Sequence, residues 1–340
     1  MSADRTVLSR GARIGRIGAL SVLVVLCVLG AYRYFAEPLQ RGTAPVTVRI
    51  TLGSGPERIS EALAAVGIDR PAWQIALALR IRGDVHALKA AHYEIPPGMP
   101  LAGLLDRITR GEGRLSEFRI IEGWTFAQVR QAAAKHPDLA QDTRDLSTAQ
   151  LRELLDIRHD SAEGLLAPDT YRFAPGMSER HVYRRAIDAM RKVLDQAWAG
   201  RAADLPLASP YEALVLASMI EKETGLDQDR ALIAGVFVNR LQRGMRLQSD
   251  PTTIYALGDA FSGRLTRADL QRALPHNTYV IAGLPPTPIA LPGRASIEAA
   301  LQPTRTRALY FVARGDGSSE FSEDLAAHQR AVNRFLKGRP

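Results

Sequence analysis

Cysteine is nearly absent from this 340-residue chain, in which Cys27 is the single one. The rest of the chain therefore has no disulfide framework and no Cys-based metal or redox site. The sequence also lacks a Gly-rich phosphate loop with its Lys, an HExxH pair and a G-x-S-x-G elbow, and its His residues are scattered. These absences disfavour hydrolysis by serine, thiol or zinc, and leave carboxylates, hydroxyls and amides as the candidate reactive groups.

The composition is that of a globular protein, with 46% hydrophobic and 24% charged residues. The net charge of +8 comes mainly from Arg residues spread along the chain, without a basic run interleaved with aromatics. Nucleic acid is therefore a weak interpretation. A polyanionic or zwitterionic polymer at a cell surface fits this charge equally well.

The N-terminus has the pattern of a membrane anchor. The stretch Ile17 to Tyr32 is uncharged and is flanked by Arg16 and Arg33. It is a little shorter than the roughly 20 residues of a typical span, but snorkelling Arg and interfacial aromatics compensate. A cleaved signal peptide is the alternative, although no good small-x-small cleavage site follows. The basic N-terminal flank predicts a cytoplasmic tail over 1–16, an anchor over 17–35 and a body outside the cytoplasm.

The exported part is predicted to have an α+β fold in two domains. After a polar linker over 36–45, an extended stretch, a Gly turn and a helix start recur three times, beginning at Val48, Tyr93 and Phe118. The order strand, two helices, strand predicts a small module over 46–113. A larger, mainly helical domain with short strands is predicted over 114–340, with a late strand and a terminal helix.

The segment "SPYEALVLASMIEKETG" places a carboxylate, Glu221, at the end of an apolar stretch, where a charged group is unexpected. Ser209, Pro210 and Glu212 predict a helix start, and Gly225 a stop. Glu221 continues the face expected to be buried, whereas Glu223 points away from it. Desolvation and the negative helix end would both raise the pKa of Glu221 and make it a general acid. The alternative is an ordinary C-terminal Glu paired with an Arg.

Two later segments supply groups of the kind that bind sugars. "RLQSDPTTIYALG" places Gln248, Ser249 and Asp250 before a helix, where Asp250 is expected to be the N-cap. "PHNTYVIAGLPPTPI" places Asn277, Thr278 and Tyr279 in a predicted loop and strand.

Six segments in order resemble the YceG-like endolytic murein transglycosylases: "EGWTF", "EGLLAPDTYRF", "ASMIEKETG", "AGVFVNRLQRGMRLQSDPTTIYALG", "NTYVIAGLPPTPIALPG" and "YFVARGDGSSEFS". The resemblance runs from the anchor to about Phe335. It implies a bacterial inner-membrane protein with one span, a cytoplasmic N-terminus, a small LysM-like module and a periplasmic catalytic domain. Peptidoglycan glycan strands are the implied substrate, and peptidoglycan synthases of the elongation or division machinery are the implied protein partners.

The implied reaction is cleavage between N-acetylmuramic acid and N-acetylglucosamine with formation of a 1,6-anhydromuramoyl end. One carboxyl serves as acid and then as base, because the C6 hydroxyl of the sugar closes on its own anomeric carbon. The resemblance assigns this role to Glu221, and neither a metal nor an organic cofactor is required. The expected substrate-binding residues are Gln248, Ser249, Asp250, Thr252, Asn277, Thr278, Tyr279, Glu163, Tyr171, Asn239 and Glu320.

The chain departs from the family pattern at Ala91, Ala167 and Glu320, where a Gly, an aromatic and a His are expected. Two other functions stay open. A two-carboxylate muramidase would use Glu163, Asp169 or Asp250 as second carboxylate, and a wall-binding scaffold would lack catalysis altogether. A pyridoxal phosphate lyase, a label given to some relatives, conflicts with the predicted exported body.

Overall fold

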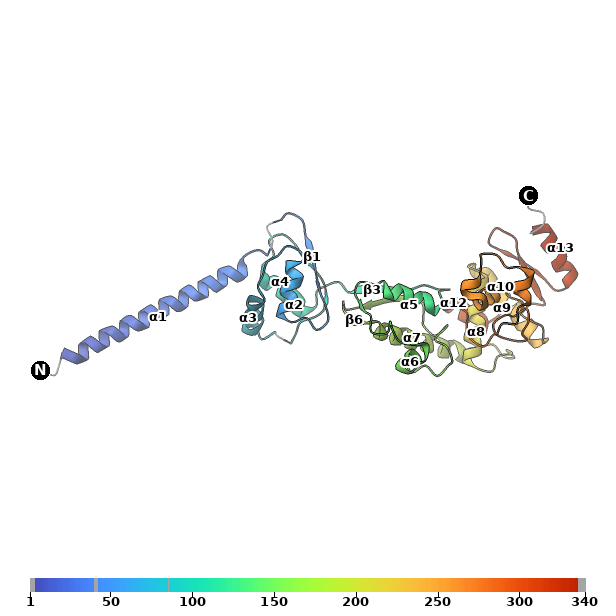
Figure 1. Cartoon of the computed structure of the whole chain (residues 1–340), viewed down its shortest axis with the longest axis horizontal. Coiled ribbons are helices and arrows are strands. Elements are labelled where there is room, and N and C mark those ends of the chain that lie inside the picture. The colour runs from blue at the N-terminus through green and yellow to red at the C-terminus, as the bar shows by residue number, and fades with distance from the viewer. Residues whose placement is uncertain (1–3, 40–41, 85, 336–340) are drawn as a thin grey trace. The chain divides into compact units, whose positions relative to one another are not determined.

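The computed structural model describes residues 4–39, 42–84 and 86–335, with the backbone alone for 4–17 and 34. It divides into two compact units, Met1–Ser116 with Phe173–Met177, and Glu117–Arg172 with Ser178–Pro340 (Figure 1). The mixture of helices with small two-stranded sheets confirms the α+β class. The predicted domain boundaries at 46, 113 and 114 remain predictions.

The first unit contains the predicted order of strand, two helices and strand. Strand β1 (Val46–Ile50) pairs antiparallel with β2 (Ala91–Ile95), and Val48 lies opposite Tyr93. Between them lie α2 (Pro56–Ala64) and α3 (Ala72–Arg82), and α4 (Leu101–Arg110) follows β2. Helix α4 buries Leu101, Leu104, Leu105 and Ile108, the i, i+3, i+4, i+7 stripe of an amphipathic helix.

Helix α1 (Asp4–Ala36) precedes this unit. Within the part of the chain whose side chains are described, no helix is long and apolar enough to cross a membrane. The predicted anchor begins at Ile17, whose side chain lies outside that part, as do residues 1–3 of the predicted tail and 40–41 of the linker.

The second unit starts with short strands and helices. Strand β3 (Ser116–Ile120), which begins at the boundary, pairs with β5 (Asp169–Phe173), and β4 (Leu139–Ala140) pairs with β6 (Met177–Ser178). Helices α5 (Phe126–Ala134) and α6 (Thr148–Leu154) both begin with the capping boxes that Thr125 and Ser147 form. The long helix α7 (Glu179–Ala199) follows.

Helix α8 (Pro210–Glu223) is the centre of the second unit. All eight residues from Ala213 to Ile220 are buried, and six of them lie in one core cluster with residues of α9 (Asp227–Gln242) and α12 (Arg294–Leu301). The hydroxyl of Ser209 accepts a hydrogen bond from the Glu212 N–H, and the helix ends at Glu223, which confirms the predicted four-turn helix.

The remaining elements of the second unit follow α9. They are α10 (Asp250–Leu257), a 3₁₀ turn (Gly258–Ala260), α11 (Arg267–Gln271), α12, the antiparallel pair β7 (Tyr310–Ala313) and β8 (Ser319–Ser322), and α13 (Leu325–Phe335). The late strand and the terminal helix are thereby confirmed. The strand predicted after Asn277 is wrong, because Asn277–Ile281 forms turns in which the N–H groups of Val280 and Ile281 both donate to the Asn277 carbonyl.

Candidate active site

The last turn of α8 carries two carboxylates that meet different surroundings. Glu221 and Glu223 are separated by about 200° around the helix axis, because each residue advances about 100°. They therefore face different neighbours.

The Glu221 carboxylate contacts the beginning of α12. Its Oε2 atom accepts hydrogen bonds from the Gly293 N–H at 3.0 Å and from the Ser296 hydroxyl at 2.7 Å. The sequence interpretation placed this carboxylate against an apolar face, whereas the structure gives it two polar donors. Because a helix N-terminus has unpaired N–H groups, a carboxylate here stabilises α12 and joins it to α8.

The Glu223 carboxylate lies in a cavity of about 330 Å³. Its Oε1 atom accepts a hydrogen bond of 2.5 Å from the Ser249 hydroxyl. Burial raises the pKa of Glu223 to about 7, and the nearby Asp250 charge adds to this increase while the Ser249 hydrogen bond opposes it. Near neutral pH, a carboxyl group with this pKa is protonated in a large fraction of the protein molecules and ionised in the rest. It can therefore both donate and accept a proton.

Three of the predicted binding residues line the same cavity as Glu223. Gln248 comes from the connection between α9 and α10, Asp250 is the first residue of α10, and Tyr279 comes from the turns after α11. The Tyr279 hydroxyl donates to Asp250 Oδ1 at 2.5 Å. The expectation that Asp250 caps α10 is wrong, because Ser249 occupies the N-cap position and no side-chain cap forms.

Buried hydroxyls and an amide hold this connection in place. The Ser249 N–H donates to Thr278 Oγ1 at 2.9 Å, and the Thr252 hydroxyl donates to the Ser249 carbonyl at 2.6 Å. The Thr253 hydroxyl donates to Asn277 Oδ1 at 2.9 Å. Thr252, Asn277 and Thr278 are fully buried, so they position the groups that line the cavity and do not line it themselves.

Sequence reasoning missed Arg240, which also lines the cavity. Its Nε donates to the Leu309 carbonyl, and its Nη1 donates to the carbonyls of Arg246 and Leu247 and to the Gln248 side chain. The guanidinium lies 5.0 Å from the centre of the Tyr310 ring, which in turn stacks with His328. Burial lowers the pKa of Arg240. The sequence pattern does not single out this residue, because two of its partners, Leu309 and Tyr310, lie much later in the chain.

Four further predicted binding residues, which do not belong to this connection, also lie outside the cavity. The Tyr171 hydroxyl donates to the Ala167 carbonyl, and the Asn239 amide donates to the carbonyls of Thr306 and Ala308. Glu320 forms an ion pair with Arg314. These three side chains hold neighbouring segments together. Glu163 is the fourth of the residues outside the cavity.

Glu163 is buried elsewhere in the second unit. Its carboxylate accepts hydrogen bonds from the Phe126 N–H at the start of α5 and from the Tyr255 hydroxyl on α10. Burial raises the pKa of Glu163 to about 7, although both hydrogen bonds oppose the increase. Asp169, another candidate second carboxylate, is exposed at the beginning of β5.

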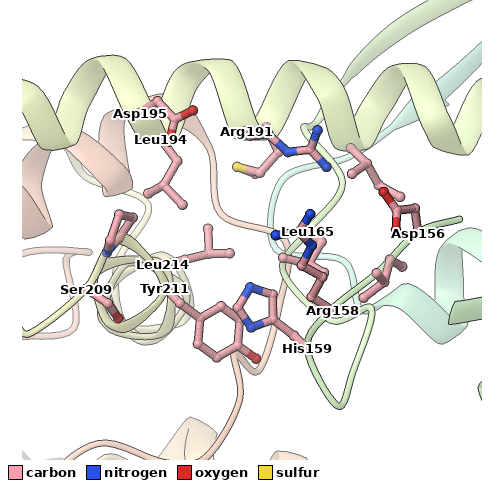
Figure 2. Close-up of a pocket in the computed structure, with 14 residues that line it drawn as sticks. Asp156, Arg158, His159, Leu165, Arg191, Leu194, Asp195, Ser209, Tyr211 and Leu214 are labelled. Atoms are coloured by element: carbon pink, nitrogen blue, oxygen red, sulfur yellow. The ribbon is translucent and has the colours of Figure 1, made fainter. Parts of the chain in front are cut away.

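A larger cavity of about 640 Å³ lies between α7, the beginning of α8 and the 156–165 segment. Figure 2 shows the His159 ring against the Tyr211 ring, with a centroid distance of 3.9 Å, and Arg158 and Arg191 nearby. Neither Glu221 nor Glu223 lines it. The smaller cavity therefore has the stronger case as the active site, since it is lined by a carboxyl with a raised pKa and by three of the predicted binding residues.

Metal ligation has no support within the described ranges, where no group of three or more His, Cys, Asp or Glu side chains is placed to hold an ion. The polar groups that line the Glu223 cavity are hydroxyls, an amide, a guanidinium, an imidazole and carboxylates. Such a set can bind sugar hydroxyls and transfer protons.

The sequence model of the YceG-like family matches residues 48–334. A protein of Bacillus subtilis named endolytic murein transglycosylase is 30% identical, over 92% of each chain. One of the same name from Streptococcus pneumoniae is 28% identical, over 92% of this chain and 64% of its own length. The crystal structure of a YceG-like protein from Listeria monocytogenes, 30% identical, covers 85% of this chain and 99% of its own with a TM-score of 0.55.

Proposed function

This chain belongs to the YceG-like family, and on that basis we propose that it is an endolytic murein transglycosylase, a lyase that cleaves the glycan strands of peptidoglycan. The observation that carries the proposal is the Glu223 carboxyl, whose pKa is raised to about 7 inside a polar cavity. The names of the B. subtilis and S. pneumoniae relatives support the same reaction.

The proposed acid is Glu223, whereas the sequence interpretation assigned this role to Glu221. Glu223 has the raised pKa and shares its cavity with Gln248, Asp250 and Tyr279. The two hydrogen bonds that Glu221 accepts from α12 support a structural role for that residue. Both assignments use the same chemistry and differ in which carboxyl carries the proton.

In the proposed reaction, Glu223 gives its proton to the glycosidic oxygen while the bond from that oxygen to the anomeric carbon of muramic acid breaks. The C6 oxygen of the same sugar then bonds to the anomeric carbon, and its proton passes to the Glu223 carboxylate. The tethered hydroxyl competes with water because of its high effective concentration. Glu223 ends the cycle protonated, and no water is consumed.

Asp250 gives a specific reason to keep the two-carboxylate muramidase as a second candidate. It lines the same cavity and its charge acts on Glu223. In the proposed transglycosylase, Asp250 stabilises positive charge at the anomeric carbon and is held by Tyr279. In the muramidase it would activate water or attack the sugar.

The cellular setting is part of the proposal. We propose that the stretch from Ile17 to Tyr32 anchors the chain in the bacterial inner membrane with the body in the periplasm, and that 46–113 is a LysM-like module that holds glycan. The support is the Arg-flanked apolar sequence and the order of strand, two helices and strand. Peptidoglycan synthases are the proposed protein partners.

Mass spectrometry of uncrosslinked glycan strands digested by the purified full-length protein tests the proposed reaction. The proposal predicts products that end in 1,6-anhydromuramic acid, which weigh one water less than hydrolysis products. Reducing ends would instead establish the muramidase. Intact strands after digestion would support the non-catalytic scaffold.

A further inference from the structure

Helix α3 is apolar on two opposite sides, and only one side contacts the core. Ile75, Ala78 and Leu79 are buried in the first unit. Trp73, Leu77 and Ile81 point outward with exposed fractions of 65%, 45% and 69%. They recur every four residues, so they form one stripe along the helix. An exposed stripe of three large apolar side chains marks a surface that contacts another apolar phase or molecule.

The beginning of α3 is fixed beside the end of α1. The Arg70 guanidinium, just before α3, lies 3.8 Å from the Glu37 carboxylate and donates to the Pro38 carbonyl. The Leu39 N–H donates to the Met99 carbonyl at 2.8 Å, and Phe35 packs against the core of the first unit. The segment that follows α1 is therefore part of this unit and does not act as a free tether at this point.

This attachment limits how far α3 lies from the end of the proposed anchor. Glu37 follows Tyr32 by five residues, so helical or extended backbone between them spans roughly 8–17 Å. Glu37 contacts Arg70, and Trp73 lies within the first turn of α3. If Tyr32 lies at the membrane surface, the stripe begins within the layer of lipid headgroups or just outside it.

The residue types of α3 fit such a surface. The helix contains no acidic residue, and Arg80 is exposed between Leu77 and Ile81. Trp is favoured at membrane interfaces, and a basic helix with an apolar stripe binds anionic headgroups while its apolar side chains enter the acyl boundary.

We propose that the stripe of Trp73, Leu77 and Ile81 lies in the interfacial layer of the membrane that anchors the chain. This inference rests on the proposed anchor and adds a second membrane contact from the first unit. One span alone lets the body rotate and tilt freely. Two contacts hold the first unit at a fixed orientation to the bilayer, which restricts the directions in which the rest of the chain can lie.

Depth-dependent fluorescence quenching tests this contact. The full-length chain with Trp124→Phe and Trp198→Phe has Trp73 as its single Trp. It is reconstituted into vesicles of phosphatidylethanolamine and phosphatidylglycerol, with and without lipids brominated near the top of the acyl chain. The matched control keeps Trp198 and carries Trp73→Phe and Trp124→Phe. Trp73 should lose most of its emission to the brominated lipid, whereas Trp198 should keep its emission.

Flotation of the same vesicles tests the proposed anchor separately from the proposed contact of the α3 stripe with the membrane. A chain that does not float with the vesicles contradicts the anchor and, with it, the membrane contact. A chain that floats while Trp73 and Trp198 respond equally to brominated lipid leaves the anchor standing and overturns the contact. Shielding of Trp73 from aqueous iodide without quenching by brominated lipid would show that protein covers the stripe, which also overturns it.

Discussion

The charge state of Glu223 depends on three effects that differ in sign. Burial is the largest effect and raises its pKa, Asp250 raises it further, and the Ser249 hydrogen bond lowers it. The outcome near 7 is suited to a group that must be an acid in one step and a base in the next. Because Ser249 and Asp250 act on this pKa in opposite directions, substituting either of them should shift the pH dependence of turnover.

Two substitutions should move the pH profile in opposite directions. Cleavage needs protonated Glu223, so kcat/KM should fall as the pH rises through its pKa. Ser249→Ala removes a donor to the carboxylate and should move this descending limb to higher pH. Asp250→Asn removes a like charge and should move it to lower pH. Each shift should be roughly one pH unit, which corresponds to about 1.4 kcal/mol.

The measurement is kcat/KM against pH for the wild type and both variants. Asp250→Asn retains an oxygen that can accept from Tyr279, so it is the milder change in structure. A descending limb that stays in place in both variants would mean that Glu223 is not the group that titrates.

Glu163 should influence stability and not catalysis. Its folded pKa of about 7 exceeds the ordinary value of 4.5. The native state therefore binds more protons between these values, and stability is full below pH 4.5 and declines as the pH rises to 7. The decline amounts to at most about 3 kcal/mol, because each unit of pKa shift is worth about 1.4 kcal/mol.

The Glu163→Gln variant tests this linkage by urea unfolding from pH 4.5 to 8. The amide does not ionise, so the variant should lose less stability than the wild type over this interval. Parallel pH curves for the two proteins would show that Glu163 does not cause the decline.

At the scale of elements, the regular patterns were predictable and the connections were not. Helices α3 and α8 follow from Pro and Ser at their starts, from Gly at or just beyond their ends, and from their apolar residues. The segment after Asn277 was predicted as a strand from its side chains. Its turns depend on the buried Asn277 amide, which donates to the carbonyls of Asp269, Leu270 and Arg272. Such contacts across a connection leave no periodic pattern.

The site was predictable in part for the same reason. Two polar segments of the sequence identified Gln248, Asp250 and Tyr279, which lie together in the cavity. Helical periodicity and the family resemblance both favoured Glu221, and periodicity did so because it assumes that the face continuous with the core contains the functional group. At the last turn of α8 that face contacts α12, and the cavity opens at Glu223. Which face is covered depends on the packing of α12, about 70 residues later in the chain.

Close packing of α9 gives a prediction at this scale. A Cβ atom on Gly235 would overlap the Thr304 carbonyl oxygen and lie 2.9 Å from Thr306 Cγ2. Gly235→Ala should therefore separate α9 from the segment that leads to β7, at a cost of about 1–3 kcal/mol despite the better helix propensity of Ala. Gly225→Ala is the matched control, because no atom lies within 4 Å of its added Cβ.

Chemical denaturation of both variants measures the difference. The Gly235 variant should unfold at lower denaturant than the wild type, and the Gly225 variant should stay close to it. Equal midpoints for the two variants would contradict the close approach of α9 to the 304–306 segment.

At the scale of the whole molecule, the chain combines a unit of strand, two helices and strand with a larger unit that contains the proposed active site. Proposed membrane contacts and glycan holding belong to the first unit, and proposed bond cleavage belongs to the second. This division predicts that the rate of turnover in the full-length protein depends on one carboxyl of the second unit. It also predicts that the first unit determines where on the membrane and the glycan turnover takes place.

The central claim is that Glu223, and not Glu221, is the acid. Its most direct test is the rate at which full-length Glu223→Gln and Glu221→Gln release anhydromuramoyl products from glycan strands, with folding checked by circular dichroism. Loss of the transferable proton should slow the Glu223 variant by about 10²–10⁴-fold or more, since one group serves both steps. The Glu221 variant should keep most of its activity, because an amide oxygen still accepts from Gly293 and Ser296. A folded Glu223→Gln protein with near wild-type turnover, beside an inactive Glu221→Gln protein, would contradict the account.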